Sequence, residues 1–390
     1  MSPSATKGGS KGPFEGIVVI DLSHVLAGPF CTMLLSDLGA RVIKVERPGS
    51  GDDSRAFGPF LDDKSLYFGF VNRGKQSIAL NLKHEDDRTL FESMVKKADV
   101  LVENFRPGTM EHLGYTWEAL SAMNPRLVYA SASGYGQTGP KRTEPAYDTV
   151  IQGMAGLMSL TGFSNGPATK AGTSIADITT GIYTFGAIVS ALYAREKSGH
   201  GARVDIAMFD AVLSILEHGL MHYAATGKVP ERLGNRHPTI TPFDTFEAAD
   251  KAFVICAGDN ALFASLCTSV GRPELATDAR FSDNDRRTEN AVALRAELEA
   301  VLKTRPAGYW LPILDKAGIP CGSINDVASA VADPQVAARN MMITAGGVRM
   351  PGNPIKISGY EDPTERSAAP ALDASGTAIR AEFASPRAAK

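Results

Sequence analysis

Residues 17–48 read IVVIDLSHVLAGPFCTMLLSDLGARVIKVERP, and this stretch decides the fold. It opens with a short run rich in β-branched residues, continues with a segment of helical apolar periodicity and closes with a second β-rich run, which predicts strand, helix and strand. The alternation continues, with strands predicted at 77–83, 99–105 and 126–134 and helices at 87–98 and 116–124. Repeated β-α-β units with buried-type strands predict an α/β fold, in which helices cover the faces of a mostly parallel sheet.

Composition places the chain among ordinary globular proteins. Its 390 residues favour two domains, 44% of them are apolar, and the net charge is −3 at pH 7. Lys and Arg (40) nearly balance Asp and Glu (43), so we expect no nucleic-acid partner. The N-terminal sequence lacks a signal-peptide pattern, and the longest apolar run, 182–194, is shorter than the roughly 20 residues that span a bilayer. The four cysteines show no metal-ligand or disulfide spacing. These features predict a cytoplasmic protein with no membrane span and no metal site.

A polar, turn-rich segment at 226–246 predicts a domain boundary. We expect a flexible N-terminus over 1–13, a large domain over 14–225, a linker over 226–246 and a smaller α/β or α+β domain over 247–330. The last segment, 331–390, shows no core of its own and is predicted to pack elsewhere or to be partly loose.

The common nucleotide-binding and hydrolase motifs are absent from the sequence. Neither GxGxxG nor GxxxxGK[ST] occurs, which disfavours a Rossmann dehydrogenase and a P-loop NTPase. Ser133 does not lie in the GxSxG motif of a nucleophile elbow. His24 follows the first predicted strand, where it fits a packed loop residue or a general base.

Asp177 precedes a long apolar helical pattern and has two interpretations. An Asp at this place is a preferred N-cap, because its carboxylate accepts the free N–H groups of the first helical turn. The same environment would hold a carboxylate ionised and aimed, as a carboxylate nucleophile requires. Spacing alone leaves both interpretations open.

Several motifs, taken together and in order, resemble the family III CoA-transferases. They are the stretch at 16–55, NRGKQSIALNLK (72–83), ADVLVENFRPGTMEHLGYTWEAL (98–120), NPRLVYASASGYGQTGP (124–140), AYDTVIQGMAG (146–156) and the stretch at 177–213. The resemblance implies that Asp177 is the nucleophile, which forms first an aspartyl anhydride and then an aspartyl-CoA thioester. It also implies that main-chain groups around Leu26 and Ala27, with a glycine-rich loop, stabilise the oxyanions.

The resemblance also implies a CoA-binding set, with the CoA thioester as substrate and no tightly bound cofactor. Arg47 matches a position that meets the nucleotide phosphates, although a surface ion pair would equally explain it. Segments matching the adenine and ribose-phosphate sites supply Leu80, Asn81, Lys83, Asn104, Phe105 and Arg106, and the segment along the pantetheine arm supplies Ser133, Gly134 and Tyr135.

The family architecture implies a homodimer of interlocked chains, each with a large Rossmann-like domain that the C-terminal segment completes. The first linker would then be 226–246 and the return linker would lie within 331–390. Where formyl-CoA transferases carry consecutive glycines, this chain reads RLGNRHPTITPF (232–243), which disfavours formyl-CoA with oxalate as the substrate pair. We expect a small dicarboxylate as acceptor, with Arg236 or His237 pairing its far carboxylate, and a plain interdomain loop is the alternative.

Two other functions remain open at this point. Racemases of α-methylacyl-CoA esters resemble this chain but carry GHD where it has AYD at 146–148, and Tyr147 in place of the histidine makes proton abstraction unfavourable. A non-catalytic CoA-binding protein is the third possibility, and the intact surroundings of Asp177 speak against it.

Overall fold

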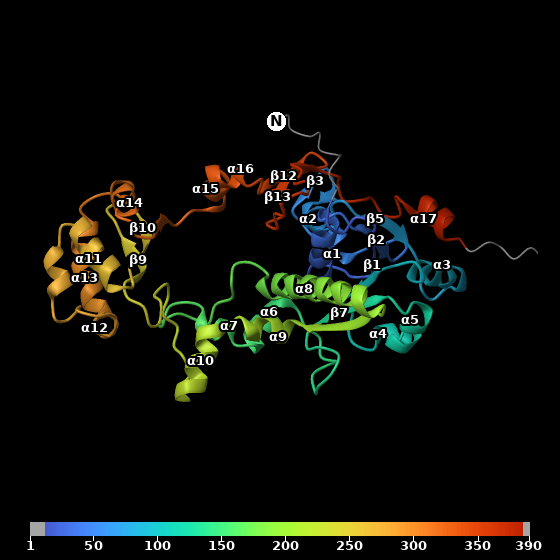
Figure 1. The fold of residues 1–390 in the computed structure, drawn as a ribbon, viewed down its shortest axis with the longest axis horizontal. Coiled ribbons are helices and arrows are strands. Elements are labelled where there is room, and N and C mark those ends of the chain that lie inside the picture. The colour runs from blue at the N-terminus through green and yellow to red at the C-terminus, as the bar shows by residue number, and fades with distance from the viewer. Residues whose placement is uncertain (1–11, 385–390) are drawn as a thin grey trace, which may run out of the picture. The chain divides into compact units, whose positions relative to one another are not determined.

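A computed structural model describes residues 12–384 (Figure 1). The chain divides into two compact units, the first made of 1–157, 170–220 and 334–390 and the second of 158–169 and 221–333. Almost all of the expected flexible N-terminus, 1–13, lies outside the described residues.

The first unit is built on a six-stranded sheet in which every neighbouring pair of strands is parallel. In spatial order the strands are β5 (Gln76–Ala79), β2 (Arg41–Glu46), β1 (Val18–Asp21), β6 (Val100–Glu103), β7 (Val128–Ser133) and β8 (Ala202–Ala207). The order runs outward in opposite directions from β1 and β6, so the switch point of the fold lies between these two strands. Ligands of open α/β sheets bind at the carboxyl ends of the strands at such a point.

Helices cover both faces of this sheet, because successive strand residues point to opposite sides. Val19 packs with α1 (Ala27–Asp37) and α8 (Ile175–Ser198). Ile20 packs on the other face with α3 (Glu85–Val95), α5 (Trp117–Met123) and α17 (Gly376–Phe383). The predicted α/β class with a parallel sheet is confirmed.

The helix α8 is longer than the apolar run noted in the sequence. Its 24 residues are apolar enough, by length and composition, to cross a membrane. Within the first unit, however, α8 packs Ile188 and Leu192 against the sheet and α1. The helix α8 is thus part of the core of the first unit.

Shorter elements complete the first unit. They are η1 (Asp53–Ala56), β3 (Phe60–Leu61), β4 (Lys64–Ser65), α2 (Leu66–Asn72), α4 (Thr109–His112), α6 (Asp148–Met154), α9 (Met208–Ser214) and α16 (Pro334–Ala338). Two helices, α7 (Leu157–Leu160) and α10 (Glu217–Thr226), cross the points where the chain passes between units.

The C-terminal segment contributes a small sheet and the helix α17. The strands β12 (Met342–Ala345), β13 (Val348–Pro351) and β14 (Glu365–Arg366) form the order β13-β12-β14. Ile343 and Met350 pack there against Phe70 of α2, so this segment has a small core that its sequence did not predict. Ile379 and Phe383 of α17 fill the face of the main sheet opposite α1.

The second unit is an antiparallel three-stranded sheet with helices packed on it. The sheet order is β11 (Cys321–Ser323), β10 (Ala252–Cys256) and β9 (Phe243–Glu247). The helices are α11 (Asn260–Ser269), η2 (Pro273–Thr277), α12 (Asn284–Glu289), α13 (Ala291–Leu302), α14 (Ala307–Lys316) and α15 (Val327–Val331). Because β9 begins at Phe243, an ordered strand occupies the end of the segment expected as a linker, 226–246.

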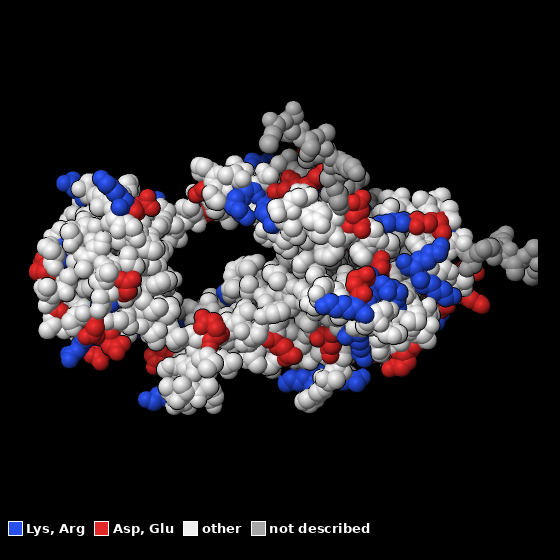
Figure 2. All heavy atoms as spheres, viewed as in Figure 1, with Lys and Arg blue, Asp and Glu red and all other residues white. Residues whose placement is uncertain are grey.

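The charged side chains are mixed in sign. On the face drawn in Figure 2, Lys and Arg side chains lie among Asp and Glu side chains. This mixed surface agrees with the nearly balanced composition.

Candidate active site

Asp177 lies in the first turn of α8, but it does not cap the helix. The cap position is Ser174, which makes no side-chain capping bond, and Asp177 is the third residue of the helix. Among the described residues, no group hydrogen-bonds or ion-pairs with the Asp177 carboxylate. The capping interpretation is therefore wrong, and the carboxylate is left free for chemistry.

Asp148, the first residue of α6, stabilises the start of α8 instead. Its Oδ1 accepts a hydrogen bond from the backbone N–H of Ala176 at 2.8 Å, and its Oδ2 accepts one from Nε2 of Gln152 at 2.7 Å. Gln152 in turn accepts the N–H of Ala171 through Oε1 at 2.8 Å. Asp148, which no local sequence pattern indicated, satisfies an open N–H group of the first turn of α8 across 28 positions in the chain.

The surroundings of Asp177 favour its protonated form. Burial and the nearby charge of Asp148 raise the pKa of Asp177 to about 7. An ionised carboxylate with so high a pKa is more basic than an ordinary aspartate, and hence a better nucleophile at neutral pH.

Asp177 opens into a cavity of about 270 Å³ at the carboxyl ends of β1, β6 and β7. The wall is formed by the segments 24–27, 104–107, 132–134 and 146–147, together with Thr109, Glu144, Asp177 and Met208. These strand ends flank the switch point of the sheet, where the topology predicts a ligand. The structure thus brings Leu26, Ala27, Asn104, Arg106, Ser133 and Gly134 together with Asp177.

Two features of this cavity can bind an oxyanion. The helix α1 begins at Ala27 with no side-chain cap and no acidic residue in its first turn, so its first N–H groups have no such partner. The Ser133 hydroxyl is buried and, among residues 12–384, has no hydrogen-bond partner. Both lie along the cavity that contains Asp177.

A second cavity of about 650 Å³ adjoins the first, since the two share His24, Phe105 and Thr109 in their walls. It gathers most of the remaining residues predicted to bind CoA, namely Arg47, Leu80, Asn81, Lys83 and Phe105. Tyr135 lines neither cavity; its ring packs against Phe209, with the ring centroids 6.0 Å apart.

Arg47 and Asn104 have partners within the protein. Arg47 makes an exposed ion pair with Asp53, the alternative role given to it above. An exposed pair of this kind contributes little, so a phosphate can compete for the guanidinium. Asn104 uses its amide to bond both the N–H and the C=O of His24, each at 2.8 Å. Its side chain therefore holds the turn after β1.

Arg236 and His237 belong to the second unit, whereas Asp177 belongs to the first. Arg236 lines a small cavity of the second unit beside Asp244 and Arg295. The Nδ1 atom of His237 accepts the backbone N–H groups of 239 and 240 at 3.2 and 3.1 Å. Their contact with an acceptor acid stays a prediction.

Two residues weighed as an acid or a base, Tyr147 and His24, both line the Asp177 cavity. Tyr147 stands at the cap of α6, exposed and in the wall of the Asp177 cavity. Burial lowers the pKa of His24, whose ring packs against Phe105.

Among the described residues, no group of three or more His, Cys, Asp and Glu side chains is placed to hold a metal ion.

The parallel sheet is covered by helices on both faces, and the Asp177 carboxylate lies beside two adjoining cavities at its switch point. This arrangement is that of an α/β enzyme with room for an extended ligand. The chain belongs to CoA-transferase family III, whose model matches residues 14–375. The family prediction made from the motifs is confirmed, as is the prediction of an acyl-CoA:carboxylate CoA-transferase.

Curated relatives carry related names. An acetyl-CoA:oxalate CoA-transferase of Acetobacter aceti is 59% identical over 97% of both chains. The human succinyl-CoA:glutarate CoA-transferase is 36% identical over 90% of this chain and 81% of its own. A crystal structure of a CAIB/BAIF family protein from Brucella suis has a TM-score of 0.85 and 42% identity, covering 96% of this chain and 100% of that one.

Proposed function

We propose that this protein transfers CoA from an acyl-CoA to a small dicarboxylate, with Asp177 as the covalent nucleophile. The observation that carries the proposal is the carboxylate itself, which has no hydrogen-bond or ion-pair partner among the described residues and lines a cavity adjoining the predicted CoA groove. Its raised pKa supports the same role. The interlocked homodimer and the cytoplasmic location remain part of the proposal.

The reaction is two exchanges at the Asp177 carboxyl. The carboxylate attacks the thioester carbonyl of the donor, the C–S bond breaks, and CoA leaves as a thiolate with a mixed anhydride left on Asp177. The thiolate then attacks the aspartyl carbonyl, and the donor acid leaves as its carboxylate. An acceptor carboxylate attacks the resulting aspartyl-CoA thioester and releases the thiolate, which finally attacks the acceptor carbonyl and frees Asp177. No net proton is taken up or released.

Each of these steps passes through a tetrahedral oxyanion, which needs donors already in place. The N–H groups at the start of α1, around Leu26 and Ala27, lie along the cavity with Asp177 and suit this role. The Ser133 hydroxyl is a second donor on the same wall.

Acetyl-CoA and oxalate are the substrates to test first. The relative that is 59% identical is named for this pair, and other relatives are named for glutarate and mesaconate. A second carboxylate loses its water on binding and needs a cation or several donors in compensation. Arg236 and His237 remain our candidates for that partner.

The test combines a substrate panel with trapping of the intermediate. Acetyl-CoA and succinyl-CoA are incubated with mono- and dicarboxylic acids, and new CoA esters are identified by mass spectrometry. We expect short dicarboxylates to be the best acceptors and Arg236→Ala to raise their KM. Preference for monocarboxylates would overturn the dicarboxylate assignment and leave CoA transfer intact.

The covalent step has its own test. Incubation with acyl-CoA followed by hydroxylamine should label the peptide that contains Asp177, and Asp177→Ala should reduce turnover to background while the protein stays folded. Substantial turnover by Asp177→Ala would show that the nucleophile is a different group.

A further inference from the structure

The turn between β1 and α1 contains a strained residue. Val25 has a φ of +65°, in the left-handed region that β-branched residues rarely adopt. Such a conformation persists only where the surrounding contacts enforce it, and it is found mostly at functional sites.

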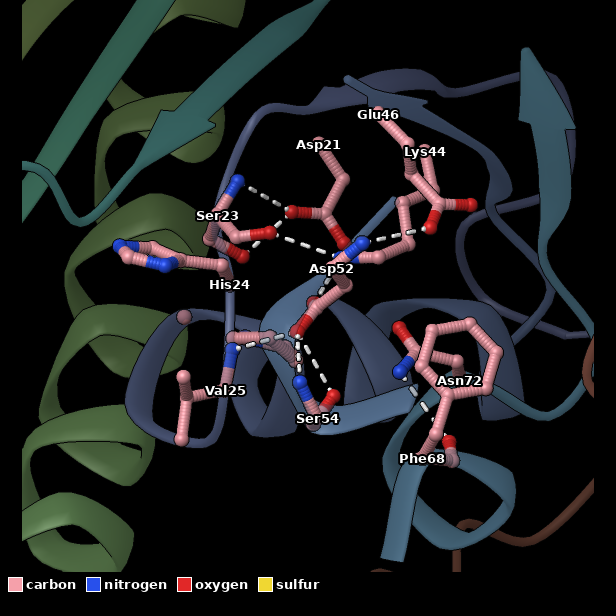
Figure 3. Close-up of polar contacts among 12 residues, drawn as sticks. Asp21, Ser23, His24, Val25, Lys44, Glu46, Asp52, Ser54, Phe68 and Asn72 are labelled. Carbon is pink, nitrogen blue, oxygen red and sulfur yellow. Dashed lines mark hydrogen bonds and ion pairs between the residues drawn. The ribbon is translucent and has the colours of Figure 1, made fainter. Parts of the chain in front are cut away.

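A buried ion pair between Lys44 and Asp52 lies beside this turn and contacts its main chain (Figure 3). Nζ of Lys44 donates to the carbonyl of Ser23 at 2.7 Å and pairs with Oδ2 of Asp52 at 2.8 Å. The other oxygen of Asp52, Oδ1, accepts the N–H of Val25 at 3.1 Å and both the N–H and the hydroxyl of Ser54, at 2.8 and 2.7 Å. Asp52 is thus the hydrogen-bond partner that holds the N–H of the strained residue.

The pair is kept ionised inside the protein. Both side chains are 1% exposed. Burial alone would raise the pKa of Asp52 and lower that of Lys44. The charge of Lys44 and the hydrogen bonds from Ser54 instead hold the pKa of Asp52 below its ordinary value, and the charges of Asp21 and Asp52 hold that of Lys44 above its ordinary value. A buried ion pair is weak evidence for stability, because the loss of solvation offsets much of the attraction. Its position at the turn supplies a different reason for its presence.

Asn104, which follows β6, also fixes this turn, because its side-chain amide hydrogen-bonds both the N–H and the C=O of His24. The His24 ring itself points away from the buried charges (Figure 3). The main chain of 23–25 is therefore tied to side chains that follow or lie on β2 and β6, on either side of β1.

The residues that follow the strained turn line the cavity of Asp177. Val25, Leu26 and Ala27 are all in its wall. The helix α8 approaches this turn closely, because a Cβ atom added at Gly181 would lie 2.8 Å from the carbonyl oxygen of Ala27. A small change of backbone at Val25 would consequently move the N–H groups of Leu26 and Ala27 relative to Asp177.

We propose that Lys44 and Asp52 are positioning residues of the transfer reaction. They hold Val25 in its left-handed conformation, so that the N–H groups of Leu26 and Ala27 face the oxyanion formed at Asp177. This inference rests on the proposed function, and in it the ion pair lowers the activation barrier of each step. Removing the ion pair should reduce kcat more than it reduces the affinity for acyl-CoA.

The test compares Asp52→Asn with a matched control in the same unit. Asp37, at the end of α1, makes an equally buried ion pair with Arg73 at 2.6 Å and lines neither of the two cavities described above. We expect both substitutions to lower Tm. Lys44 and Asp52 lie in the wall of the predicted CoA groove, but each side chain is only 1% exposed. Only Asp52→Asn should lower kcat, by about 10- to 100-fold, as expected when catalytic donors are displaced, while the KM for acyl-CoA changes by less than about threefold.

A second measurement follows the strain itself. Glycine adopts positive φ without penalty, so the loss of kcat caused by Asp52→Asn should be smaller when Val25→Gly is also present. Should Asp52→Asn not fold, the double variant Lys44→Met/Asp52→Asn, which leaves neither member of the pair charged, takes its place. An undiminished loss in the Val25→Gly background, or a kcat loss matched by Asp37→Asn, would overturn the proposal.

Hydrogen exchange separates this inference from the proposed function. The His24 and Val25 amides are hydrogen-bonded and should lose protection in Asp52→Asn but not in Asp37→Asn. Retained protection in Asp52→Asn would refute the positioning role even in an active enzyme. If the wild type transfers no CoA to any acid of the panel, the proposed function fails, and lost protection would still support the hold of Asp52 on the turn.

Discussion

The carboxylate of Asp148 accepts the backbone N–H of Ala176 at 2.8 Å, one residue before Asp177. Two acidic groups at the start of α8 thus have different tasks. Asp148 satisfies the backbone N–H of Ala176. Burial and, after it, the charge of Asp148 raise the pKa of Asp177. This division of roles makes the pH dependence of the enzyme a sensitive report on the site.

Replacing Asp148 should shift the pH profile of the reaction. Asp177 must be ionised to attack, so kcat/KM of the wild type should fall below pH of about 7. Asp148→Asn removes the neighbouring charge and should move this acidic limb to lower pH, measured from initial rates across a pH series. An unmoved limb would mean that burial alone sets the pKa of Asp177.

The same raised pKa predicts a stability effect. Folding raises the pKa of Asp177 from about 3.9 to about 7, so between these values the folded protein binds a proton more tightly than the unfolded chain. The free energy of unfolding therefore falls as the pH rises through this window. We expect Asp177→Asn to melt at a higher temperature than the wild type at pH 8 and at a similar temperature at pH 4. A gap in Tm that is the same at both pH values would contradict this.

Arg47 should contribute to binding of the nucleotide part of CoA. Removing its guanidinium in Arg47→Ala should raise the KM for acyl-CoA with little change in kcat, because the phosphate contact is the same in ground and transition states. The KM for an acyl-pantetheine, which lacks the nucleotide, should not change. Arg126→Ala, which removes another exposed ion pair of the first unit, with Glu196, is the matched control. An equal effect on both thioesters would place Arg47 outside the nucleotide site.

Ser133→Ala should separate activity from stability. The hydroxyl is buried and unpaired among residues 12–384, so its removal should leave Tm unchanged or raise it slightly. If the hydroxyl donates to the reacting oxyanion, kcat should fall by about tenfold or more. Calorimetry and initial rates on the same preparation would test both parts, and an unchanged kcat would remove Ser133 from the reaction.

Local sequence patterns predicted much of the fold. The β-branched run at 17–23 contains β1, and the apolar periodic stretch after it contains α1. These elements depend on residue types close together in the chain, which is why their order could be predicted. The small sheet of β12, β13 and β14 was missed because its core depends partly on Phe70, which is far away in the sequence.

In the candidate site, too, contacts between residues distant in the sequence could not be predicted. Asp177, Leu26 and Ala27, which the motif resemblance singled out, line one cavity, and their roles stay predictions. The role of Asp148 was missed, because an N-cap supplied from another helix leaves no local spacing. Likewise, nothing in the sequence distinguishes Lys44 from an ordinary surface charge, since its burial exists only once β1 and β2 are paired.

The last helix of the chain, α17, has a consequence for how the protein is made. Ile379 and Phe383 fill a core whose other members come mainly from the first 130 residues, and Glu382 holds Arg41 of β2 by a bidentate ion pair. The part of this face that α3 and α5 do not cover therefore stays exposed until the end of the chain has been synthesised. Ribosomes must release nearly the whole polypeptide before the first unit can close, so a chain that stops before α17 exposes this apolar part of the sheet to aggregation.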